Sequence, residues 1–239
     1  MSQLPAMCAE SPLAVARTQR AIRDMGFKPP RIAMISHPAD TSELQYQSGC
    51  KINQVISVAG WGRTEKDLPR MIDVMRIFLT LHRDWCFCLV GDGVSEEILK
   101  KCGINEELLS RIKLTGHLPH DQLAVEYNRS RIFILTSLAE GQSIAAGEAL
   151  TCGCSYVGAA NLNGCSYLVS MNSGTIAPVR SVAQIGDALN AEVNEWEAGR
   201  RDPDMIAAQW KERLGAESVC RQLLTELKSI TENSSREKK

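Results

Sequence analysis

Short apolar segments and stretches with helical periodicity alternate along the chain from about residue 31 to residue 160. Each apolar segment has the length of one strand, and the stretches between them are long enough for a crossover helix. This spacing predicts an α/β fold in which a doubly wound parallel sheet carries helices on both faces. The predicted strands lie at 31–35, 55–60, 87–91, 111–116, 132–137 and 155–159.

The predicted helices carry their own start signals, and the whole pattern is that of a Rossmann-like domain. Asp67 precedes a segment with Pro69 in its first turn and an apolar face that begins at Met71. After Ile176 the sheet pattern stops, and only helices are expected, the last segment forming one or two of them. The other predicted helices lie at 14–25, 95–101, 120–127, 144–152, 181–197 and 204–230.

The composition argues against several classes of partner. The net charge of −1 and the pI near 6.4 argue against nucleic acid, and aromatic residues at 5% leave few rings for a base-stacking surface. No apolar run approaches the roughly 20 residues of a membrane-spanning helix, and Glu10 and Arg17 are unlike a signal peptide. We therefore expect a cytoplasmic protein without a transmembrane segment, and peripheral contact with a membrane stays open.

Nine cysteines raise the question of a metal site or of disulfides. They are Cys8, Cys50, Cys86, Cys88, Cys102, Cys152, Cys154, Cys165 and Cys220. No pair has the Cys-x-x-Cys spacing of a zinc site, and both Cys-x-Cys pairs lie in apolar surroundings. Because buried cysteine behaves as a small hydrophobic residue, we expect reduced, buried thiols, with zinc as the alternative.

The segment from Glu140 to Glu148 places two carboxylates around a predicted helix start. Glu140 follows the strand at 132–137, and Glu148 lies about one turn into the helix that begins after Ser143. Backbone N–H groups at a helix N-terminus lack intrahelical partners and favour an anion. Two carboxylates can hold hydroxyl groups on either side of that anion. The order carboxylate, anion site, carboxylate fits a ligand made of a sugar, a diphosphate and a ribose.

Three further loops follow predicted strands, where ligands bind in an open parallel sheet. The turn 60–66 carries Arg63 and Lys66, which can neutralise a diphosphate or remain solvated at a helix start. The turn 91–93 has two glycines that permit close approach of the backbone, although many turns do. The turn 115–119 contains a histidine that can bind a ligand or pack in the loop. Taken singly, each of these signals is weak.

In their order, these motifs resemble the C-terminal half of family 4 retaining glycosyltransferases of the GT-B fold. The resemblance covers about residues 31 to 230. It consists of a Gly-Arg turn followed by lysine, a Val-Gly-x-Gly turn, a Thr-Gly-x-Leu-Pro segment, and a Glu-x7-Glu motif that runs into Glu-Ala-x-x-x-Gly. In this chain these are Gly62-Arg63 with Lys66, Val90–Gly93, Thr115–Pro119, Glu140–Glu148 and Glu148–Gly153.

The resemblance implies a role for each of these residues. It implies that Glu148 holds the ribose hydroxyl groups and that Glu140 contacts the donor sugar. Arg63 and Lys66 would stabilise the leaving diphosphate without a metal or other cofactor. The implied catalytic residues are therefore Arg63, Lys66 and Glu140. The other implied nucleotide-sugar-binding residues are Gly62, Gly91, Gly93, His117, Leu118, Gly141, Gln142, Ser143 and Ile144, with the backbone around His117 and Leu118 facing the nucleobase.

The triplet Asp202-Pro203-Asp204 has the Asp-x-Asp pattern of metal-dependent glycosyltransferases. It lies between two predicted helices, beyond the sheet. Aspartate followed by proline is typical of a helix start, so we expect a helix cap and no metal site.

The resemblance also implies how the chain is organised and what it does. Residues 1–40 correspond to a remnant of an N-terminal domain and a hinge, 41–230 to the nucleotide-sugar-binding domain, and 231–239 to a disordered tail. The implied activity is transfer of a sugar from a UDP-sugar or GDP-sugar to a glycan or lipid-linked acceptor, with retention at the anomeric carbon. The alternative is a non-catalytic nucleotide-sugar-binding subunit that works with a separate N-terminal-domain polypeptide. An epimerase or phosphorylase of the same architecture is a third interpretation.

Overall fold

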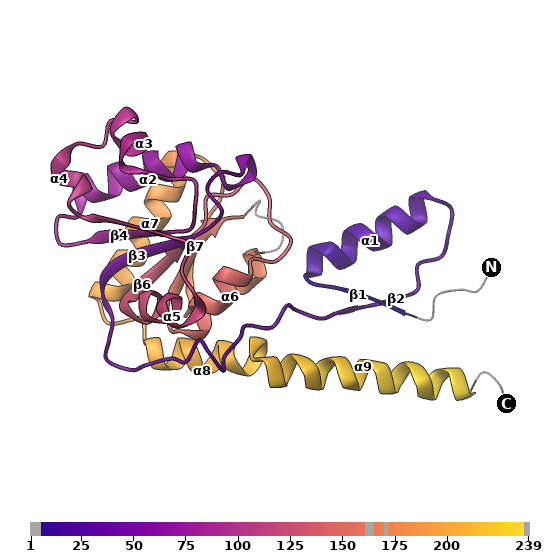
Figure 1. Cartoon of the computed structure of the whole chain (residues 1–239). Coiled ribbons are helices and arrows are strands. Elements are labelled where there is room, and N and C mark those ends of the chain that lie inside the picture. Colours follow the sequence, from indigo (N-terminus) through magenta and orange to yellow (C-terminus); the bar gives the residue numbers. More distant parts are fainter. Residues whose placement is uncertain (1–5, 161–164, 170–171, 237–239) are drawn as a thin grey trace.

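The computed structural model describes residues 6–160, 165–169 and 172–236. Its main body is a six-stranded sheet with helices on both faces (Figure 1). The strand order is β5-β4-β3-β6-β7-β8, and all neighbours are parallel. The predicted doubly wound α/β fold is therefore confirmed. The strands are β3 (Ile52–Val58), β4 (Cys86–Val90), β5 (Ile112–Gly116), β6 (Ser130–Ile134), β7 (Ser155–Ala159) and β8 (Gly174–Ala177).

The winding direction of the sheet reverses between β3 and β6. From β3 the chain moves outward through β4 to β5, and it then returns to place β6 on the other side of β3. In an open parallel sheet, the loops after two such strands diverge and leave a crevice at the carboxyl ends of the strands. The loops after β3 and β6 therefore form the candidate ligand site of this fold.

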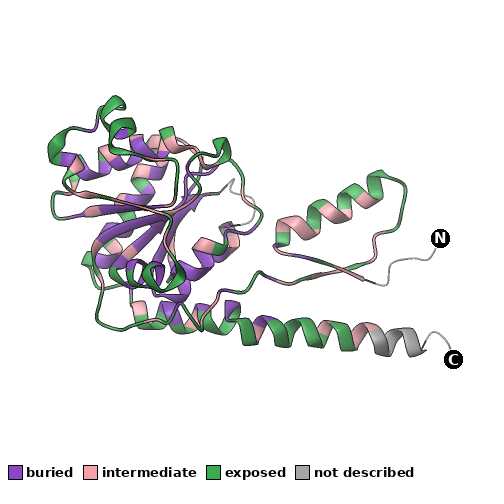
Figure 2. Cartoon of the chain, viewed as in Figure 1, coloured by how far each residue is buried: buried purple, intermediate pink, exposed green. Residues whose placement is uncertain are grey.

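Two groups of helices cover the sheet. On one face α2 (Leu68–Leu81) contacts α7 (Val182–Glu197), and on the other face α6 (Ile144–Thr151) contacts α5 (His120–Arg129) and α8 (Pro203–Leu214) (Figure 1). Figure 2 shows the core between these layers. The apolar face predicted for α2 is buried, because its members recur at helical spacing. They are Met71, Ile72, Val74, Met75, Phe78 and Leu79. The short helices α3 (Glu96–Lys101) and α4 (Glu106–Leu109) follow β4.

A smaller unit lies beside this body. It consists of β1 (Ala6–Ala9), α1 (Pro12–Asp24) and β2 (Arg31–Met34), in which β1 and β2 pair in parallel as a separate sheet. The strand predicted at 31–35 therefore exists but does not belong to the main sheet. Figure 1 shows this unit standing apart from the main body, and α1 has no buried residue.

The last helix, α9 (Ala216–Arg236), runs away from the main body along this unit (Figure 1). Arg31 Nη2 lies 2.6 Å from Glu226 Oε2 and ties the two together. The helix continues into the segment 231–239, for which a disordered tail was expected, because no glycine or proline stops it there. Residues 237–239 lie outside the described part of the chain. Among the described residues, no helix has both the length and the apolar character needed to cross a membrane.

Sequence patterns missed two short strands and misjudged some cysteines. β1 and β8 have four residues each and were not predicted, although β2 of the same length was; in β8 only Ile176 and Ala177 are apolar. All nine cysteines are free thiols. Burial is confirmed for Cys88, Cys152, Cys154 and Cys165, whereas Cys86 is half-buried. The prediction of burial is wrong for four cysteines, which are exposed: Cys8, Cys50, Cys102 and Cys220.

A buried ion pair fastens α7 to the segment before α8. Arg201 Nε donates to Glu192 Oε1 at 2.6 Å, and Arg201 Nη2 donates to Glu192 Oε2 at 2.9 Å. The side chains are 5% and 0% exposed. Thr175 Oγ1 in β8 donates to the same carboxylate at 2.6 Å. Removing one partner of such a pair leaves the other charge buried without compensation.

We therefore expect Glu192→Ala to lower the free energy of unfolding by about 3–5 kcal/mol, measured by urea denaturation. Glu197 lies on the same helix and is exposed, so Glu197→Ala is the matched control and should change stability by no more than about 0.5 kcal/mol. Equal effects of the two substitutions would contradict a structural role for the buried pair.

Candidate functional site

Lys66 and Glu140 meet where the strand order reverses. Lys66 ends the 3₁₀ helix η1 (Thr64–Lys66) after β3, and Glu140 lies in the loop after β6. Lys66 Nζ is 2.7 Å from Glu140 Oε1, and the two side chains are 20% and 11% exposed. Ser137 Oγ donates to the same carboxylate oxygen at 2.7 Å. Two of the three residues predicted to be catalytic are therefore in contact.

Arg63, the third of these residues, does not join this pair. Its side chain is 72% exposed, and its Nη1 lies 3.9 Å from Glu65 Oε1. An exposed guanidinium is free to reorient toward an anion, whereas Lys66 is already held by Glu140. The structure thus positions Lys66 at the crevice, and a diphosphate role for Arg63 stays a prediction.

Glycines bring together the turns after β3, β4 and β5. Gly91 has a φ of +111°, and a Cβ there would lie 1.9 Å from the carbonyl oxygen of Ala59. Gly93 has a φ of +98°, and a Cβ there would lie 2.2 Å from the amide nitrogen of Gly62. The N–H of Gly91 also donates to the carbonyl of Gly116 at 2.7 Å. Only glycine fits at positions 91 and 93, so these predicted site residues shape the crevice wall.

His117 and Leu118 lie in the turn after β5. The backbone N–H of His117 donates to Asp92 Oδ1 at 3.2 Å, and its side chain is exposed. Leu118 is partly buried against the core. The amide of His117, expected to face a nucleobase, is therefore already engaged by Asp92, and its imidazole is the exposed part.

The N-terminus of α6 is partly satisfied by its own cap. Ser143 Oγ accepts a hydrogen bond from the N–H of Ala146 at 3.2 Å. One of the amides expected to receive an anion is thus paired, because serine is a strong N-cap residue. Gly141 and Ile144 are exposed at the opening of this helix. A Cβ at Gly141 would lie 2.9 Å from Glu10 Oε1, so the end of β1 reaches this loop.

Gln142 contacts the protein's own backbone. Its Oε1 accepts from the N–H of His37 at 2.7 Å, and its Nε2 donates to the carbonyl of His37 at 3.2 Å. Nearby, Tyr167 Oη lies 3.3 Å from Ser36 Oγ and donates to the carbonyl of Glu10 at 3.4 Å. These bonds hold the crossing segment (residues 35–51, between β2 and β3) against the loop that carries Glu140. The amide of Gln142 is therefore occupied, which differs from its predicted ligand-binding role.

Glu148 lies in the first turns of α6 as predicted, and it is buried, with 8% of its surface exposed. Tyr127 Oη in α5 donates to Glu148 Oε2 at 3.1 Å. Burial raises the pKa of Glu148 above its ordinary value, although the bond from Tyr127 and the nearby His120 oppose this shift. A buried carboxylate with a perturbed pKa is typical of a functional site. Tyr127 was not predicted, because its partner is on another helix, 21 residues along the chain.

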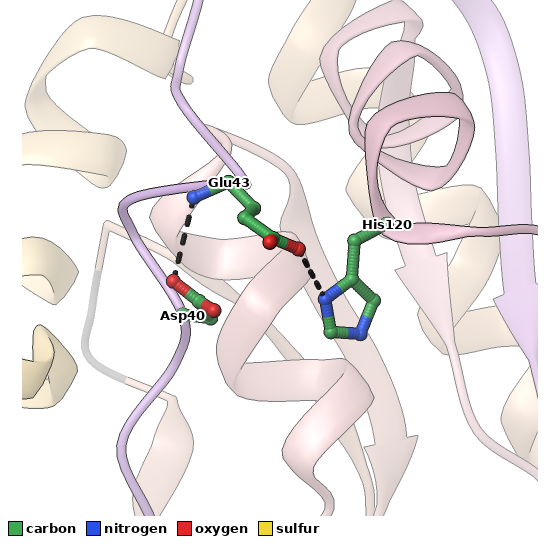
Figure 3. Close-up of side chains that lie close together, drawn as sticks. All are labelled: Asp40, Glu43 and His120. Carbon is green, nitrogen blue, oxygen red and sulfur yellow. Dashed lines mark hydrogen bonds and ion pairs between the residues drawn. The ribbon is translucent and has the colours of Figure 1, made fainter.

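A second polar cluster lies near Glu148 and consists of Asp40, Glu43 and His120 (Figure 3). Their ligand atoms lie within 4.8 Å of one another. Glu43 Oε2 is 2.8 Å from His120 Nδ1, and hydrogen bonds from Ser42 hold the pKa of Asp40 below its ordinary value. Carboxylates and imidazole can bind a divalent cation. The turn at Ser42 and the hydrogen bond between Glu43 and His120 account for this arrangement without a cation.

The Asp-x-Asp triplet is a helix cap. Asp202 Oδ1 accepts from the N–H groups of Asp204 at 2.9 Å and of Met205 at 3.2 Å. Pro203 is the first residue of α8. The predicted cap is confirmed.

Comparison with known proteins identifies the family of the chain. A model of the family described as glycosyl transferases group 1 matches residues 50–209. The chain belongs to the group 1 glycosyltransferases. The matched segment contains Lys66, Glu140 and Glu148, so the carboxyl ends of β3 and β6 lie within the family's module.

Individual relatives are distant and longer. The chain is 25% identical over 130 residues to the phosphatidylinositol N-acetylglucosaminyltransferase A-type subunit from Arabidopsis thaliana, a match that covers 54% of this chain and 29% of that protein. HepE of Anabaena in complex with UDP superposes with a TM-score of 0.75 at 16% identity, over 94% of this chain and 64% of its own. The GtfA/B complex superposes with a TM-score of 0.74 at 18% identity, and the match covers 95% of this chain and 46% of that chain. The chain thus spans less than two thirds of these relatives, and the two structures share its fold.

Two buried glutamates have pKa values displaced in opposite directions. Burial raises the pKa of Glu148. Burial also acts on Glu126, but hydrogen bonds from Lys113 and Gln54 outweigh it and lower its pKa. A raised folded-state pKa contributes stability at low pH that is lost as the pH rises through that pKa, and a lowered one contributes stability that is lost as the pH falls.

We therefore expect Glu148→Gln to raise the free energy of unfolding at pH 7, because it removes a buried charge while keeping an acceptor for Tyr127. The gain should shrink toward pH 4, where the wild-type carboxyl binds its proton. Glu126→Gln is the matched comparison and should lower stability at pH 7. Urea titrations at both pH values measure these effects, and a destabilised Glu148→Gln variant at pH 7 would contradict the assignment.

Proposed function

We propose that this chain is the donor-binding half of a retaining glycosyltransferase. It transfers a sugar from a UDP-sugar or GDP-sugar to a glycan or lipid-linked acceptor. The observation that carries the proposal is the 2.7 Å contact between Lys66 and Glu140 at the reversal of strand order, within the family's module. A cation for a leaving diphosphate and a carboxylate for sugar hydroxyl groups are side by side there.

In this mechanism the donor enters between Lys66 and Glu140 and separates the pair. Lys66 turns to the diphosphate and stabilises the negative charge that grows as the bond to the anomeric carbon breaks. Glu140 accepts hydrogen bonds from the donor sugar, and Ser137 keeps its carboxylate oriented. Because Lys66 and the unpaired amides at the start of α6 supply positive potential, the proposed reaction needs no metal cofactor.

The nucleoside end of the donor lies toward Glu148 in this proposal. The buried carboxylate accepts hydrogen bonds from the ribose hydroxyl groups, which compensate the cost of burying its charge. Tyr127 holds the carboxylate in place through its hydroxyl group. HepE, which shares the fold, was solved in complex with UDP, and this supports a nucleoside diphosphate as the ligand.

A non-catalytic nucleotide-sugar-binding subunit is the second candidate function. It is favoured by the exposure of the β1-α1-β2 unit, since α1 has no buried residue and parallel strands are normally covered on both faces. A separate N-terminal-domain polypeptide is the proposed partner, and it would cover this unit and provide the acceptor site. The proposed location is the cytoplasm with peripheral membrane contact, which the similarity to a component of a phosphatidylinositol N-acetylglucosaminyltransferase supports.

Isothermal titration with UDP, GDP and their sugars tests the proposed function. We expect one of these ligands to bind, and Glu148→Ala should weaken binding by about 1–3 kcal/mol, because ribose hydroxyl groups would lose their partner. Absence of binding by all of them would overturn the proposal. Hydrolysis or transfer of a donor sugar by the purified chain alone would contradict the non-catalytic alternative.

Lys66 should act on the diphosphate alone. We expect Lys66→Met to weaken binding of UDP by about 1.5–3 kcal/mol, the contribution of a charged hydrogen bond, and to leave uridine unaffected. The control is Lys101→Met, since Lys101 is exposed and pairs with Glu97 on the surface. Equal losses for UDP and uridine would show that Lys66 supports the fold of the site and not the phosphate.

A further inference from the structure

A cavity of about 440 Å³ lies between the crossing segment and α8. None of the residues assigned above to the nucleotide sugar lines it. Its volume falls in the range of roughly 300–1,000 Å³ that is typical of small-molecule sites. The crossing segment contributes Thr41, Leu44, Gln45 and Tyr46, α6 contributes Thr151, and α8 contributes Asp204, Ala207, Ala208 and Lys211.

The charges of this cavity cancel. Asp204 and Lys211 project from the same helix, two turns apart, and both line the cavity. A phosphate or a carboxylate ligand would meet Asp204 as well as Lys211, so the cavity has no preference for an anion. Thr41, Thr151 and Gln45 also line the cavity. Thr151 Oγ1 donates to the carbonyl of Glu148 at 2.8 Å and Gln45 Nε2 donates to the carbonyl of Ser42 at 3.1 Å, so each keeps an oxygen that can accept a hydrogen bond from a ligand. Such neutral donors and acceptors suit a ligand that carries several hydroxyl groups.

Tyr46 gives the cavity an unused hydrogen-bond donor. Its Oη is buried and forms no hydrogen bond of ordinary length, although Asp204 and Ser48 are close enough to shift its pKa. Burial and the Asp204 carboxylate raise the pKa of Tyr46 to about 12, so the hydroxyl group keeps its proton at neutral pH. A buried donor without a partner destabilises the fold, because it has lost its hydrogen bonds to water. A ligand oxygen placed at Tyr46 would remove that cost.

The ring of Tyr46 is held against the backbone. A Cβ at Gly153 would lie 2.8 Å from Tyr46 Cε2, so the ring contacts the turn after α6 directly. On α8, Ala207 and Ala208 leave space where larger side chains would fill the cavity. The cavity therefore combines a fixed aromatic ring, a carboxylate, an ammonium group and hydroxyl groups around the space beside Ala207 and Ala208.

We propose that this cavity binds a neutral pyranose sugar at a second site, separate from the nucleotide-sugar crevice. A pyranose has hydroxyl groups for Asp204, Lys211, Gln45 and Tyr46, and C–H faces for the apolar residues of the lining. Because the cavity bridges the crossing segment and α8, a sugar bound there would also fix the position of the crossing segment. The ligand is either a free monosaccharide or one unit of a glycan.

Saturation-transfer NMR on the full chain tests this proposal with glucose, mannose, galactose, N-acetylglucosamine and their methyl glycosides as probes. We expect at least one of them to bind. Binding of the glycosides would identify a glycan unit as the ligand, and binding of the free sugars alone would identify a monosaccharide. Absence of saturation transfer to every probe at millimolar concentration would overturn the proposal.

Two variants test whether the sugar binds in this cavity. Ala208→Phe fills the cavity and Asp204→Asn removes its carboxylate, and each should weaken binding about tenfold or more, as expected for losing a hydrogen-bonded contact. The matched control is Met205→Phe, which adds the same ring to an exposed position of α8 that does not line the cavity. Circular dichroism checks that each variant is folded.

Two further arms separate this site from the proposed nucleotide-sugar site. Glu148→Ala should leave sugar binding unchanged, and excess UDP should not displace the sugar. Displacement by UDP, or binding unaffected by Ala208→Phe, would place the sugar elsewhere and overturn the second site. If the unmutated chain binds a sugar but neither UDP nor GDP, the proposed function is contradicted and the second site is not.

Discussion

The parallel pairing of β3 with β6 is the constraint on which the rest of the site depends. Since the winding direction reverses at this pair, the loops after the two strands diverge and open a crevice. Lys66 leaves one strand and Glu140 the other, and their 2.7 Å contact closes the gap between residues 74 positions apart. The turn after β4 packs against the loop after β3, and the turn after β5 is bonded to the turn after β4. All four predicted loops lie at one edge because the strands are parallel.

The polar side chains of the crevice are of two kinds. Some are bonded to the protein's own backbone, and others keep the capacity to bind a ligand. Gln142 has both ends of its amide bonded to His37, and Ser143 caps its own helix. Glu148 is different, because it is buried with Tyr127 as its hydrogen-bond donor and has a raised pKa. Proteins commonly accept a cost in stability at functional sites. That cost is the physical argument for the proposed role of Glu148 in binding the ribose.

Sequence patterns anticipated most of the main body. The strands from β3 to β7 and the helices α2, α6 and α7 lie within a few residues of their predicted positions, because apolar alternation and capping residues act locally. β8 was missed, since only Ile176 and Ala177 of its four residues are apolar, and β2 (Arg31–Met34) belongs to a separate sheet. Strand pairing depends on the whole chain, so the alternation pattern alone grouped residues 31–35 with the main strands, whereas the family resemblance assigned residues 1–40 to a separate unit.

The sequence by itself determined the fold class, the motif order and the residue types at the crevice, because these follow from local periodicity and spacing. The tertiary structure alone decided how these groups are used. It paired Lys66 with Glu140 and left Arg63 exposed, it occupied Gln142 with a backbone 105 residues away, and it buried Glu148 beneath Tyr127. It also formed the cavity at Tyr46 between two segments that are distant in sequence. The reason is physical: hydrogen bonding and burial join groups that are close in space, and a linear pattern contains only neighbours in sequence.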